Sequence, residues 1–388
     1  MVIFGTRPEA IKVAPVILAL DHSRGFQAIP VVTAQHRSML DQVLDLFGIR
    51  PHHDLDLMQD RQTLAGITCK ALGGLAPLVD SERPDAIVVQ GDTTTTFAGA
   101  LAAFYSQIPV FHMEAGLRTN DPYSPYPEEI NRRLTTQLGT VHLAPTQTSK
   151  QNLLRENVDE KRIIVTGNTV IDALHLTVAR SRAYEDPALE MLDDDLRRVL
   201  LVTAHRRESW GKPMRDIGAA VAEIARREPE LLVVFPIHKN PAVRDAVMPQ
   251  VGGLDNVMVI EPLGYSSFAR LMNRAHVVLS DSGGVQEEAP SLGKPVLCMR
   301  ETTERPEGVA AGTVKLVGTD PGTIVAEVET LLHDGDAYRA MATAVNPYGD
   351  GHAARRTVES LAHFLDGAAA PEEFGEAGDD LVAEHPAA

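Results

Sequence analysis

Twelve short apolar runs, separated by amphipathic segments, limit the folds open to this chain more than any other feature. Most runs are rich in β-branched residues and apolar at consecutive positions, as in "AIVVQ" (86–90) and "LLVVFPIH" (231–238). This pattern is typical of strands buried on both faces. Residues 63–80 and 214–228, by contrast, have the apolar spacing of amphipathic helices. Because strands and helices alternate along the chain, we expect parallel sheets with helices on both faces, an α/β doubly wound fold.

The number of strands and the chain length predict two domains. Twelve strands exceed one ordinary open sheet, whereas two sheets of about six fit, and 388 residues correspond to about two domains. The break falls at 179–195, a polar stretch without a strand pattern. We expect domains at 1–175 and 176–353, facing each other across a cleft. A helix at about 354–368 would pack back on the first domain, and 369–388 would be an acidic, disordered tail.

Composition narrows the functional classes. Hydrophobic residues make up 44% and charged residues 23%, as in an ordinary globular protein. The formal charge of −17 argues against a nucleic-acid surface, which needs a basic face, but allows an anionic small ligand held by local Arg, Lys and helix N-termini. Neither a membrane span nor a signal peptide is predicted. The two cysteines, Cys69 and Cys298, lie in distant segments, which argues against a disulfide framework and favours the cytosol.

The segment "FGTRPEAIK" (4–12) follows the first predicted strand and opens a helix. Gly5 permits a tight turn, and Pro8 suits a first helical turn, where its missing N–H has no partner to lose. Arg7 and Lys12 then lie near a helix N-terminus, a favourable place for a phosphate or a carboxylate. The alternative is an ordinary strand–helix turn with solvated charges.

The segment "SDSGGVQEEAPSLGKPV" (280–296) has the same organisation in the second half of the chain. After a strand that ends at Asp281, Ser282, Gly283 and Gly284 can bring bare N–H groups to a diphosphate. The acids that follow are well placed to accept hydrogen bonds from ribose hydroxyls. Alternatively, they are charges favoured by the helix dipole. These acids are Glu287 and Glu288.

In "TAHRRES" (203–209), His205 ends the first strand of the second half. A histidine there can donate to a phosphate or transfer a proton near neutral pH. The adjacent Arg206 and Arg207 strengthen the case for an anion site. The alternative is a structural histidine.

Three acids, Asp92, Glu114 and Glu128, each follow a strand or start a helix at one predicted edge of the first sheet. Carboxylates crowded at one site repel, so at least one pKa should rise, which provides an acid and a base at the same pH. The alternative is three solvated acids. The threonines at 93–96 can cap the next helix. A metal site would need a third ligand beside Glu114 and His112, and none is apparent, so no metal is predicted.

The motifs, in this order and spacing, resemble the bacterial non-hydrolysing UDP-N-acetylglucosamine 2-epimerases from residue 2 to about residue 365. The matching segments include "FGTRPEAIK", "TAQHR", "QGDTTTTFAGALAAFY", "HMEAGLRT", "SPYPEEINR", "APTQTSKQNLLRENV", "TGNTVIDAL", "TAHRRESWG", "SDSGGVQEEAPSLGKPVL" and "RETTERPEGVAAGTVKLVGTD". The resemblance implies two Rossmann-like domains of the glycosyltransferase B type. It also implies interconversion of UDP-GlcNAc and UDP-ManNAc in the cytoplasm by a homodimer, without a cofactor. The family's route is elimination of UDP to 2-acetamidoglucal, followed by re-addition.

The resemblance also carries roles to individual residues of this chain. The implied catalytic set is Asp92, Glu114, Glu128, His205 and Arg132. The implied substrate contacts are Arg7, Lys12, Phe268, Ser282, Gly283, Gly284, Glu288 and Arg305. An allosteric site for UDP-GlcNAc would involve Gln35, Arg37 and His238. Two features depart from the family: the first strand is shorter than usual, and Ser38 replaces a longer polar residue.

Other functions remain open at this point. A retaining B-type glycosyltransferase would need an acceptor groove and would leave the three acids unexplained. A hydrolysing epimerase would release free ManNAc and usually carries a kinase domain that is not seen in this sequence. A non-catalytic UDP-sugar sensor would keep the loop at 282–284 but would have no need of the three acids together.

Overall fold

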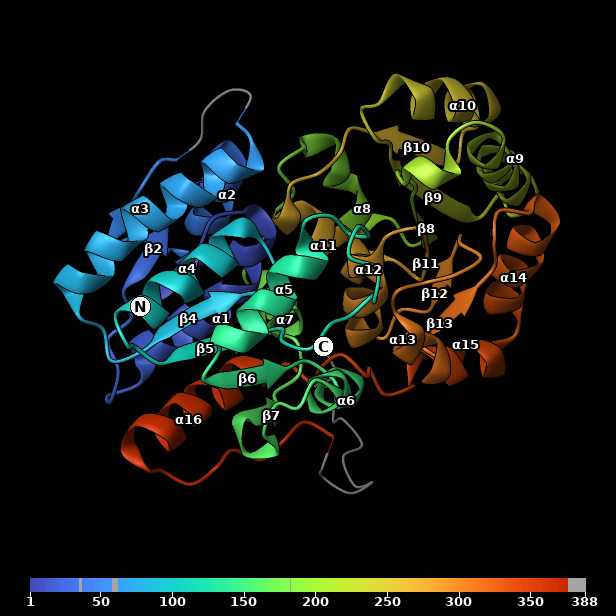
Figure 1. The fold of residues 1–388 in the computed structure, drawn as a ribbon. Coiled ribbons are helices and arrows are strands. Elements are labelled where there is room, and N and C mark those ends of the chain that lie inside the picture. The colour runs from blue at the N-terminus through green and yellow to red at the C-terminus, as the bar shows by residue number, and fades with distance from the viewer. Residues whose placement is uncertain (35–36, 58–61, 182, 376–388) are drawn as a thin grey trace. The chain divides into compact units, whose positions relative to one another are not determined.

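The computed structural model describes residues 1–34, 37–57, 62–181 and 183–375. Contacts divide the chain into two compact units (Figure 1). Unit 1 is Met1–Ala173 with Gly349–Ala388, and unit 2 is Leu174–Tyr348. The chain therefore leaves unit 1 within one helix and returns to it near its C-terminus. Among the described residues, no helix is both long and apolar enough to cross a membrane.

Unit 1 is built on a parallel seven-stranded sheet. The strand order is β3-β2-β1-β4-β5-β6-β7. The chain adds β2 and β3 on one side of β1 and then adds β4 to β7 on its other side, as in doubly wound folds, so the order of addition reverses between β1 and β4. Register is fixed by pairs such as Ile3 opposite Val31 and Val89 opposite His112. The strands are β1 (Val2–Phe4), β2 (Pro30–Val32), β3 (His53–Asp54), β4 (Ile87–Gln90), β5 (Val110–Met113), β6 (Val141–Ala144) and β7 (Ile163–Val165).

Helices cover this sheet in two groups. α3, α4 and α5 pack side by side (Figure 1), and α3 and α4 share a core with alternate residues of β1 and β4. α1 packs with α2 and α16, and Phe364 of α16 meets Phe111 of β5 edge to face at 6.0 Å. The helices are α1 (Arg7–His22), α2 (Arg37–Phe47), α3 (Leu64–Glu82), α4 (Thr94–Tyr105), α5 (Glu128–Leu138), α6 (Gln147–Arg155), α7 (Thr169–Arg180) and α16 (Ala353–Asp366).

Unit 2 contains a parallel six-stranded sheet in the order β10-β9-β8-β11-β12-β13, the same topology with its reversal between β8 and β11. Two buried clusters are formed by alternate residues of its strands, as in strands covered on both faces. The strands are β8 (Arg198–Thr203), β9 (Leu231–Pro236), β10 (Val257–Ile260), β11 (Val277–Ser280), β12 (Val296–Cys298) and β13 (Val314–Leu316). The helices are α8 (Met191–Asp194), α9 (Lys212–Arg227), α10 (Pro241–Val251), α11 (Tyr265–Arg274), α12 (Gly283–Glu288), α13 (Pro306–Ala310), α14 (Pro321–His333) and α15 (Gly335–Ala342).

The predicted α/β doubly wound fold with two sheets is confirmed, with three differences in detail. The described part of the chain has thirteen strands, because the two-residue edge strand β3 was not predicted. The boundary between the units lies at Ala173 and Leu174, inside α7, about two residues before the expected domain boundary at 175/176 and upstream of the polar stretch at 179–195. Residues 369–375, expected to be disordered, instead pack on unit 1: Phe374 N donates to Val165 O at 2.8 Å, and Lys150 pairs with Glu373.

Candidate active site

Several of the predicted functional residues follow the strands that flank the two reversals of strand order. In unit 1, Lys12 follows β1 and Asp92 follows β4, the two strands that flank the reversal. In unit 2, His205 follows β8 and Ser282 follows β11, which occupy the same positions in the second sheet. In open α/β sheets this point, at the carboxyl ends of the strands, is where ligands bind.

The loop after β1 is held by a capping box. Thr6 caps α1 and accepts from Glu9 N, while Glu9 Oε2 accepts from Gly5 N at 3.0 Å and Thr6 N at 2.7 Å. The other oxygen of this buried carboxylate accepts from Thr93 Oγ1 at 2.6 Å and Thr96 Oγ1 at 3.1 Å. Thr93 in turn caps α4, as predicted. Glu9 therefore fixes the start of α1, the helix that carries Lys12, to the loop that carries Asp92.

Gly5 is required for close packing rather than for a turn. A Cβ at this position would lie 2.2 Å from Thr33 Oγ1 and 2.6 Å from Thr95 Oγ1, which are themselves 2.8 Å apart. Any side chain would push the end of β1 away from Thr33, which follows β2, and from Thr95 in the first turn of α4. The predicted placement of Pro8 in the first turn of α1 is confirmed.

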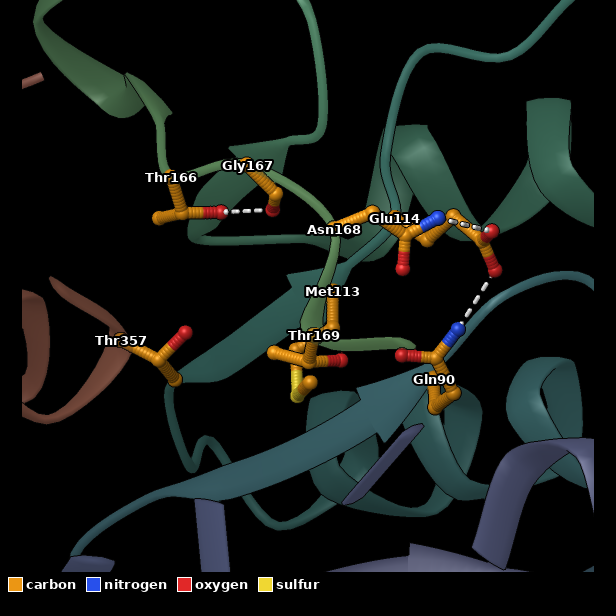
Figure 2. Close-up of a pocket in the computed structure, with 8 residues that line it drawn as sticks. All are labelled: Gln90, Met113, Glu114, Thr166, Gly167, Asn168, Thr169 and Thr357. Atoms are coloured by element: carbon orange, nitrogen blue, oxygen red, sulfur yellow. Dashed lines mark hydrogen bonds between the residues drawn. The ribbon is translucent and has the colours of Figure 1, made fainter. Parts of the chain in front are cut away.

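Glu114 follows β5 and is the most constrained of the three predicted acids. Its backbone is in the left-handed region at φ 58°, which is uncommon for a residue other than glycine. Gln90 Nε2 donates to one carboxylate oxygen at 2.6 Å, and Asn168 Nδ2 donates to the other at 3.2 Å (Figure 2). Lys12 forms an ion pair with the same carboxylate. In this structure Lys12 thus contacts a catalytic candidate rather than standing as a solvated charge.

A small cavity of about 10 Å³ lies beside this carboxylate. That volume corresponds to about one water molecule. The buried Gln90 Oε1 has no hydrogen-bond partner among the described residues. The lining residues are Gln90, Met113, Glu114, Thr166, Gly167, Asn168, Thr169 and Thr357 (Figure 2).

Asp92 is held by α5. Arg132 forms an ion pair with its carboxylate, and Asn131 Nδ2 donates to its backbone oxygen at 3.0 Å. Burial raises the pKa of Asp92, and the charge of Glu114 adds to that rise, while Arg132 and Lys12 oppose it. The charge of one predicted acid, Glu114, therefore contributes to the raised pKa of another, Asp92.

Glu128 and Glu129 have different environments. Glu128 is the first residue of α5 and is partly exposed. Three and four residues later, Asn131 and Arg132 lie on the same helix face, so Glu128 is on the side of α5 that holds Asp92. Glu129, which sequence reasoning did not single out, is fully buried. Glu129 accepts from Thr119 N at 3.1 Å and pairs with Arg132 and Arg133. In the sequence, only their positions in the helix distinguish Glu128 from Glu129.

His112 does not lie free beside Glu114. Its ring is fully buried, and Nε2 lies 2.7 Å from Gly91 O. The next ring is His142, with 6.5 Å between the ring centroids. Among the described residues, no group of three His, Cys, Asp or Glu side chains has the arrangement of a metal site.

In unit 2, one buried carboxylate connects both predicted motifs. Asp281 is fully buried, and its Oδ2 accepts from His205 N and Arg206 N, each at 2.8 Å. Its Oδ1 lies 2.9 Å from His205 Nδ1. Although burial acts to raise the pKa of Asp281, His205 and the two backbone N–H groups hold it below its usual value. Sequence reasoning treated Asp281 only as the end of a strand.

The loop after Asp281 begins α12. Ser282 N donates to Ser280 Oγ at 3.0 Å, and Gly283 and Gly284 form the first turn. A Cβ on Gly283 would lie 3.6 Å from Arg206 Nη2, so a guanidinium lies beside this glycine. The loop thus combines small residues with a nearby positive charge, as an anion site requires.

The two glutamates of α12 have separate partners. Glu288 Oε1 accepts from Tyr265 Oη at 3.0 Å. Burial, together with the charge of Glu288, raises the pKa of Tyr265 well above its usual value, so the hydroxyl remains a donor. Glu287 forms an ion pair with Arg305. Both acids lie at the end of α12 rather than in its first turn, which excludes the dipole-capping alternative.

The remaining predicted residues lie in less constrained places. Arg7 is the first residue of α1 and makes no hydrogen bond or ion pair with the described residues. Phe268 of α11 packs partly buried against the core of unit 2. Of the allosteric candidates, Gln35 lies outside the described residues, Arg37 begins α2, and the exposed His238 stacks on His205 with 6.3 Å between centroids.

Comparison with known proteins agrees with this arrangement. Residues 18–362 match the family described as UDP-N-acetylglucosamine 2-epimerase. The chain belongs to this family. It is 53% identical to the UDP-N-acetylglucosamine 2-epimerase of Salmonella typhimurium, covering 94% of this chain and 98% of the relative. Identity to the same enzyme of Escherichia coli is 54%, with coverage of 93% and 97%.

A solved member of the family has the same fold. The crystal structure of the Neisseria meningitidis UDP-GlcNAc 2-epimerase, bound to UDP-GlcNAc, is similar with a TM-score of 0.81 and 48% identity. The match covers 93% of this chain and 98% of that one. The resemblance inferred from the motifs is therefore confirmed at the level of the epimerase family and its Rossmann-like sheets.

Proposed function

We propose that this protein is a non-hydrolysing epimerase that interconverts UDP-GlcNAc and UDP-ManNAc. The observation that supports this most strongly is the arrangement in unit 1, where Glu114, after β5, pairs with Lys12 and Asp92, after the neighbouring β4, pairs with Arg132. A UDP-sugar sensor would not need two such carboxylates, each held by a cation from a different helix. Proton transfer at a carbon atom does need them.

The proposed reaction begins with elimination. The C1–O bond breaks with its electrons passing to the diphosphate of UDP. The electrons of the C2–H bond form the C1=C2 bond of 2-acetamidoglucal, and the proton passes to a protein carboxylate. In the second half, a proton is delivered to the opposite face of C2, and UDP adds again at C1. Atoms and charge balance without a redox cofactor.

In unit 1, two carboxylates in different environments suit these opposite transfers. Glu114, ion-paired with Lys12, is suited to act as the ionised base. The raised pKa of Asp92 favours a group that keeps a proton to deliver. Glu128 belongs to the same proposed set through its place on α5. Arg132 keeps Asp92 in position between turnovers.

Unit 2 would bind the leaving group. The loop Ser282–Gly284 and the nearby Arg206 supply donors for the diphosphate, and His205 adds a further donor. Glu288 would accept from the ribose hydroxyls, with Phe268 beside the uracil. We also propose nucleotide contacts by Arg7, Lys12 and Arg305. For Lys12 and Arg305 this means sharing or exchanging their present partners, Glu114 and Glu287.

We further propose that the enzyme works as a cytoplasmic homodimer activated by UDP-GlcNAc. Two neighbouring helices of unit 1 expose large apolar side chains that a second copy could cover. They are Phe104 and Tyr105 of α4, and Ile130 and Leu134 of α5. The two free cysteines suit a reducing compartment. Activation would involve Gln35, Arg37 and His238.

The deciding experiment is proton NMR of UDP-GlcNAc with the enzyme in D2O. We expect UDP-ManNAc to form and deuterium to enter C2 of the product, because the C2 proton passes to an exchangeable protein acid. Epimerisation with full retention of C2 protium would rule out the elimination route. Release of free ManNAc would indicate a hydrolysing enzyme, and unchanged UDP-GlcNAc would leave the transferase or the sensor.

A further inference from the structure

Asp281 is placed to act on the side chain of His205 as well as on its backbone. The two residues are neighbours because Thr203 and Ser280, at the ends of β8 and β11, are paired in the sheet. Their hydroxyl oxygens lie 2.7 Å apart, and Asp281 N donates to Thr203 O at 3.3 Å. The sheet therefore fixes where the carboxylate stands relative to the histidine.

The two carboxylate oxygens have separate contacts. Oδ2 accepts from the backbone N–H groups of His205 and Arg206, both at 2.8 Å. Oδ1 lies 2.9 Å from His205 Nδ1, within ion-pair distance although the angles are not those of a hydrogen bond, and it makes no hydrogen bond with any described residue. One oxygen thus holds the loop, while the other faces the imidazole ring. A carboxylate can only accept, so the neutral ring must carry its proton on Nδ1 to use this contact.

The opposite side of the ring is accessible. The His205 side chain is 42% exposed, whereas Asp281 is fully buried. Two other groups that gain or carry charge are close. His238 stacks on the ring at 6.3 Å, and Arg206 follows directly in the chain, with its own guanidinium 3.9 Å from Glu304. In the described structure neither residue makes a hydrogen bond to the ring nitrogens, and the Asp281 carboxylate is the acceptor beside Nδ1.

We propose that Asp281 is a positioning residue that fixes His205 with its proton on Nδ1 and leaves Nε2 free for the substrate. This inference rests on the proposed role of His205 in the epimerase reaction. Nε2 of the neutral ring can then take up a second proton from solvent, and the buried carboxylate stabilises the charge that results. Once protonated, the same ring is a cationic donor for the diphosphate.

Asp281→Asn separates this role from support of the loop. The amide oxygen can still accept from the two backbone N–H groups. The amide NH₂ then faces His205 Nδ1 and can only donate, which favours the tautomer with the proton on Nε2. We expect this reversal of the tautomer to lower kcat by at least about 100-fold, with a change in KM of less than about threefold.

The test combines turnover with ¹⁵N NMR of the histidine rings in the full-length protein, with His205 assigned by loss of its signals in His205→Gln. The control is Asp320→Ala, which removes the cap of α14 in unit 2, where Asp320 accepts from Thr323 N at 2.9 Å. The control should lower thermal stability without changing the His205 tautomer or kcat. A loss of kcat in Asp281→Asn with an unchanged tautomer would assign Asp281 a structural role and overturn the proposal.

The wild-type measurement keeps the proposal testable even if Asp281→Asn does not fold. Protonation of the neutral His205 ring on Nε2 in the wild-type protein would overturn it directly. If the wild-type protein shows the Nδ1–H tautomer but does not convert UDP-GlcNAc, the proposed epimerase function is wrong. The proposed effect of Asp281 on the His205 tautomer would still hold. Normal turnover in a folded Asp281→Asn variant would instead remove Asp281 from the reaction while leaving the epimerase function intact.

Discussion

At the scale of single residues, the carboxylates of unit 1 carry the first prediction. Asp92→Asn, Glu114→Gln and Glu128→Gln should each lower turnover by at least about 100-fold, the scale of general acid–base catalysis. The losses should not add in double variants, because groups that act as a unit fail together. UDP affinity should change little, since the diphosphate is assigned to other residues.

Turnover and UDP binding measured on the same purified variants decide this point. Asp193→Asn, an exposed acid of unit 2 that pairs with Arg270, is a control for loss of one negative charge. It should leave turnover unchanged. Near-normal turnover in any of the three variants removes that residue from the set, and normal turnover in all of them would leave the acids with a structural role alone.

A second residue-scale prediction concerns Tyr265, whose hydroxyl donates to Glu288 at 3.0 Å. If Glu288 accepts from the ribose hydroxyls, Glu288→Gln should weaken UDP binding by about 1–3 kcal/mol. Tyr265→Phe should leave Glu288 in place but less well oriented. Tyr265→Phe should therefore weaken the binding of UDP more than it weakens the binding of 2′-deoxy-UDP, so that the preference for UDP falls.

Calorimetric titration with both nucleotides provides the measurement for Tyr265. Tyr338→Phe is a matched control, because its hydroxyl donates to His276 O at 3.3 Å and does not contact a residue assigned to the nucleotide. Equal weakening of both ligands by Tyr265→Phe would mean that the hydroxyl supports the fold and has no part in ribose recognition.

From the sequence, candidate site residues at strand ends could be predicted better than the residues that hydrogen-bond to them. Asp92, Glu114 and His205 were identifiable because a polar side chain directly follows an apolar run. Gln90, Asn168 and Tyr265 were not, since their contacts join segments far apart in the chain. Glu128 and Glu129 are adjacent acids, and only the rotation of α5 about its axis determines which one is buried.

At the scale of elements, Glu129 is predicted to fasten the loop at 119–120 to α5. Its oxygens accept from Thr119 N at 3.1 Å and Asn120 N at 3.2 Å, and Arg132 and Arg133 pair with it. Burial alone would raise the pKa of Glu129, but these contacts lower it, so the native state holds the carboxylate ionised. Glu129→Gln should therefore reduce the free energy of unfolding by about 1–3 kcal/mol.

The neighbouring Glu128→Gln is the matched control for this effect. Glu128 is partly exposed, so its substitution should change stability by less than about 0.5 kcal/mol. Urea unfolding should be followed by far-UV circular dichroism, because the one tryptophan, Trp210, lies in unit 2 and Glu129 in unit 1. Equal stability of the two variants would show that the contacts of Glu129 add nothing to the fold.

The element types could be predicted because most strands are apolar at consecutive positions, whereas helices have apolar residues spaced three and four apart. The edge strand β3 was missed because His53 and Asp54 are two polar residues whose pairing with β2 is all that makes them a strand. The unit boundary falls within about two residues of the expected one at 175/176, inside α7, whose helical pattern is continuous. A local pattern gives no sign that contacts change from one unit to the other at Ala173.

For the molecule as a whole, stability should depend on pH through histidines buried inside unit 1. Burial lowers the pKa of His112 from 6.5 to about 4 and that of His142 from 6.5 to about 3. Both rings are therefore neutral in the native protein down to mildly acidic pH. Asp172 acts in the opposite direction, since burial raises its pKa from 3.8 to about 6, so the native protein gains a proton there before the unfolded chain does.

The sign of the histidine effect follows from proton uptake by the two states. As the pH falls from 6.5 toward 4, the unfolded chain protonates these rings while the native protein does not, so stability is lost on acidification. At about 1.4 kcal/mol per pH unit, each ring should cost about 3 kcal/mol by pH 4.

His142→Gln removes one ring and should flatten the fall of Tm between pH 6.5 and 4, as measured by scanning calorimetry. The exposed His52 supplies the control, because His52→Gln should leave the wild-type profile unchanged. The wild-type protein, His142→Gln and His52→Gln all contain Asp172, so its opposing effect on stability cancels when they are compared. A wild-type slope that persists in His142→Gln would mean that His142 is already accessible to protons in the native state.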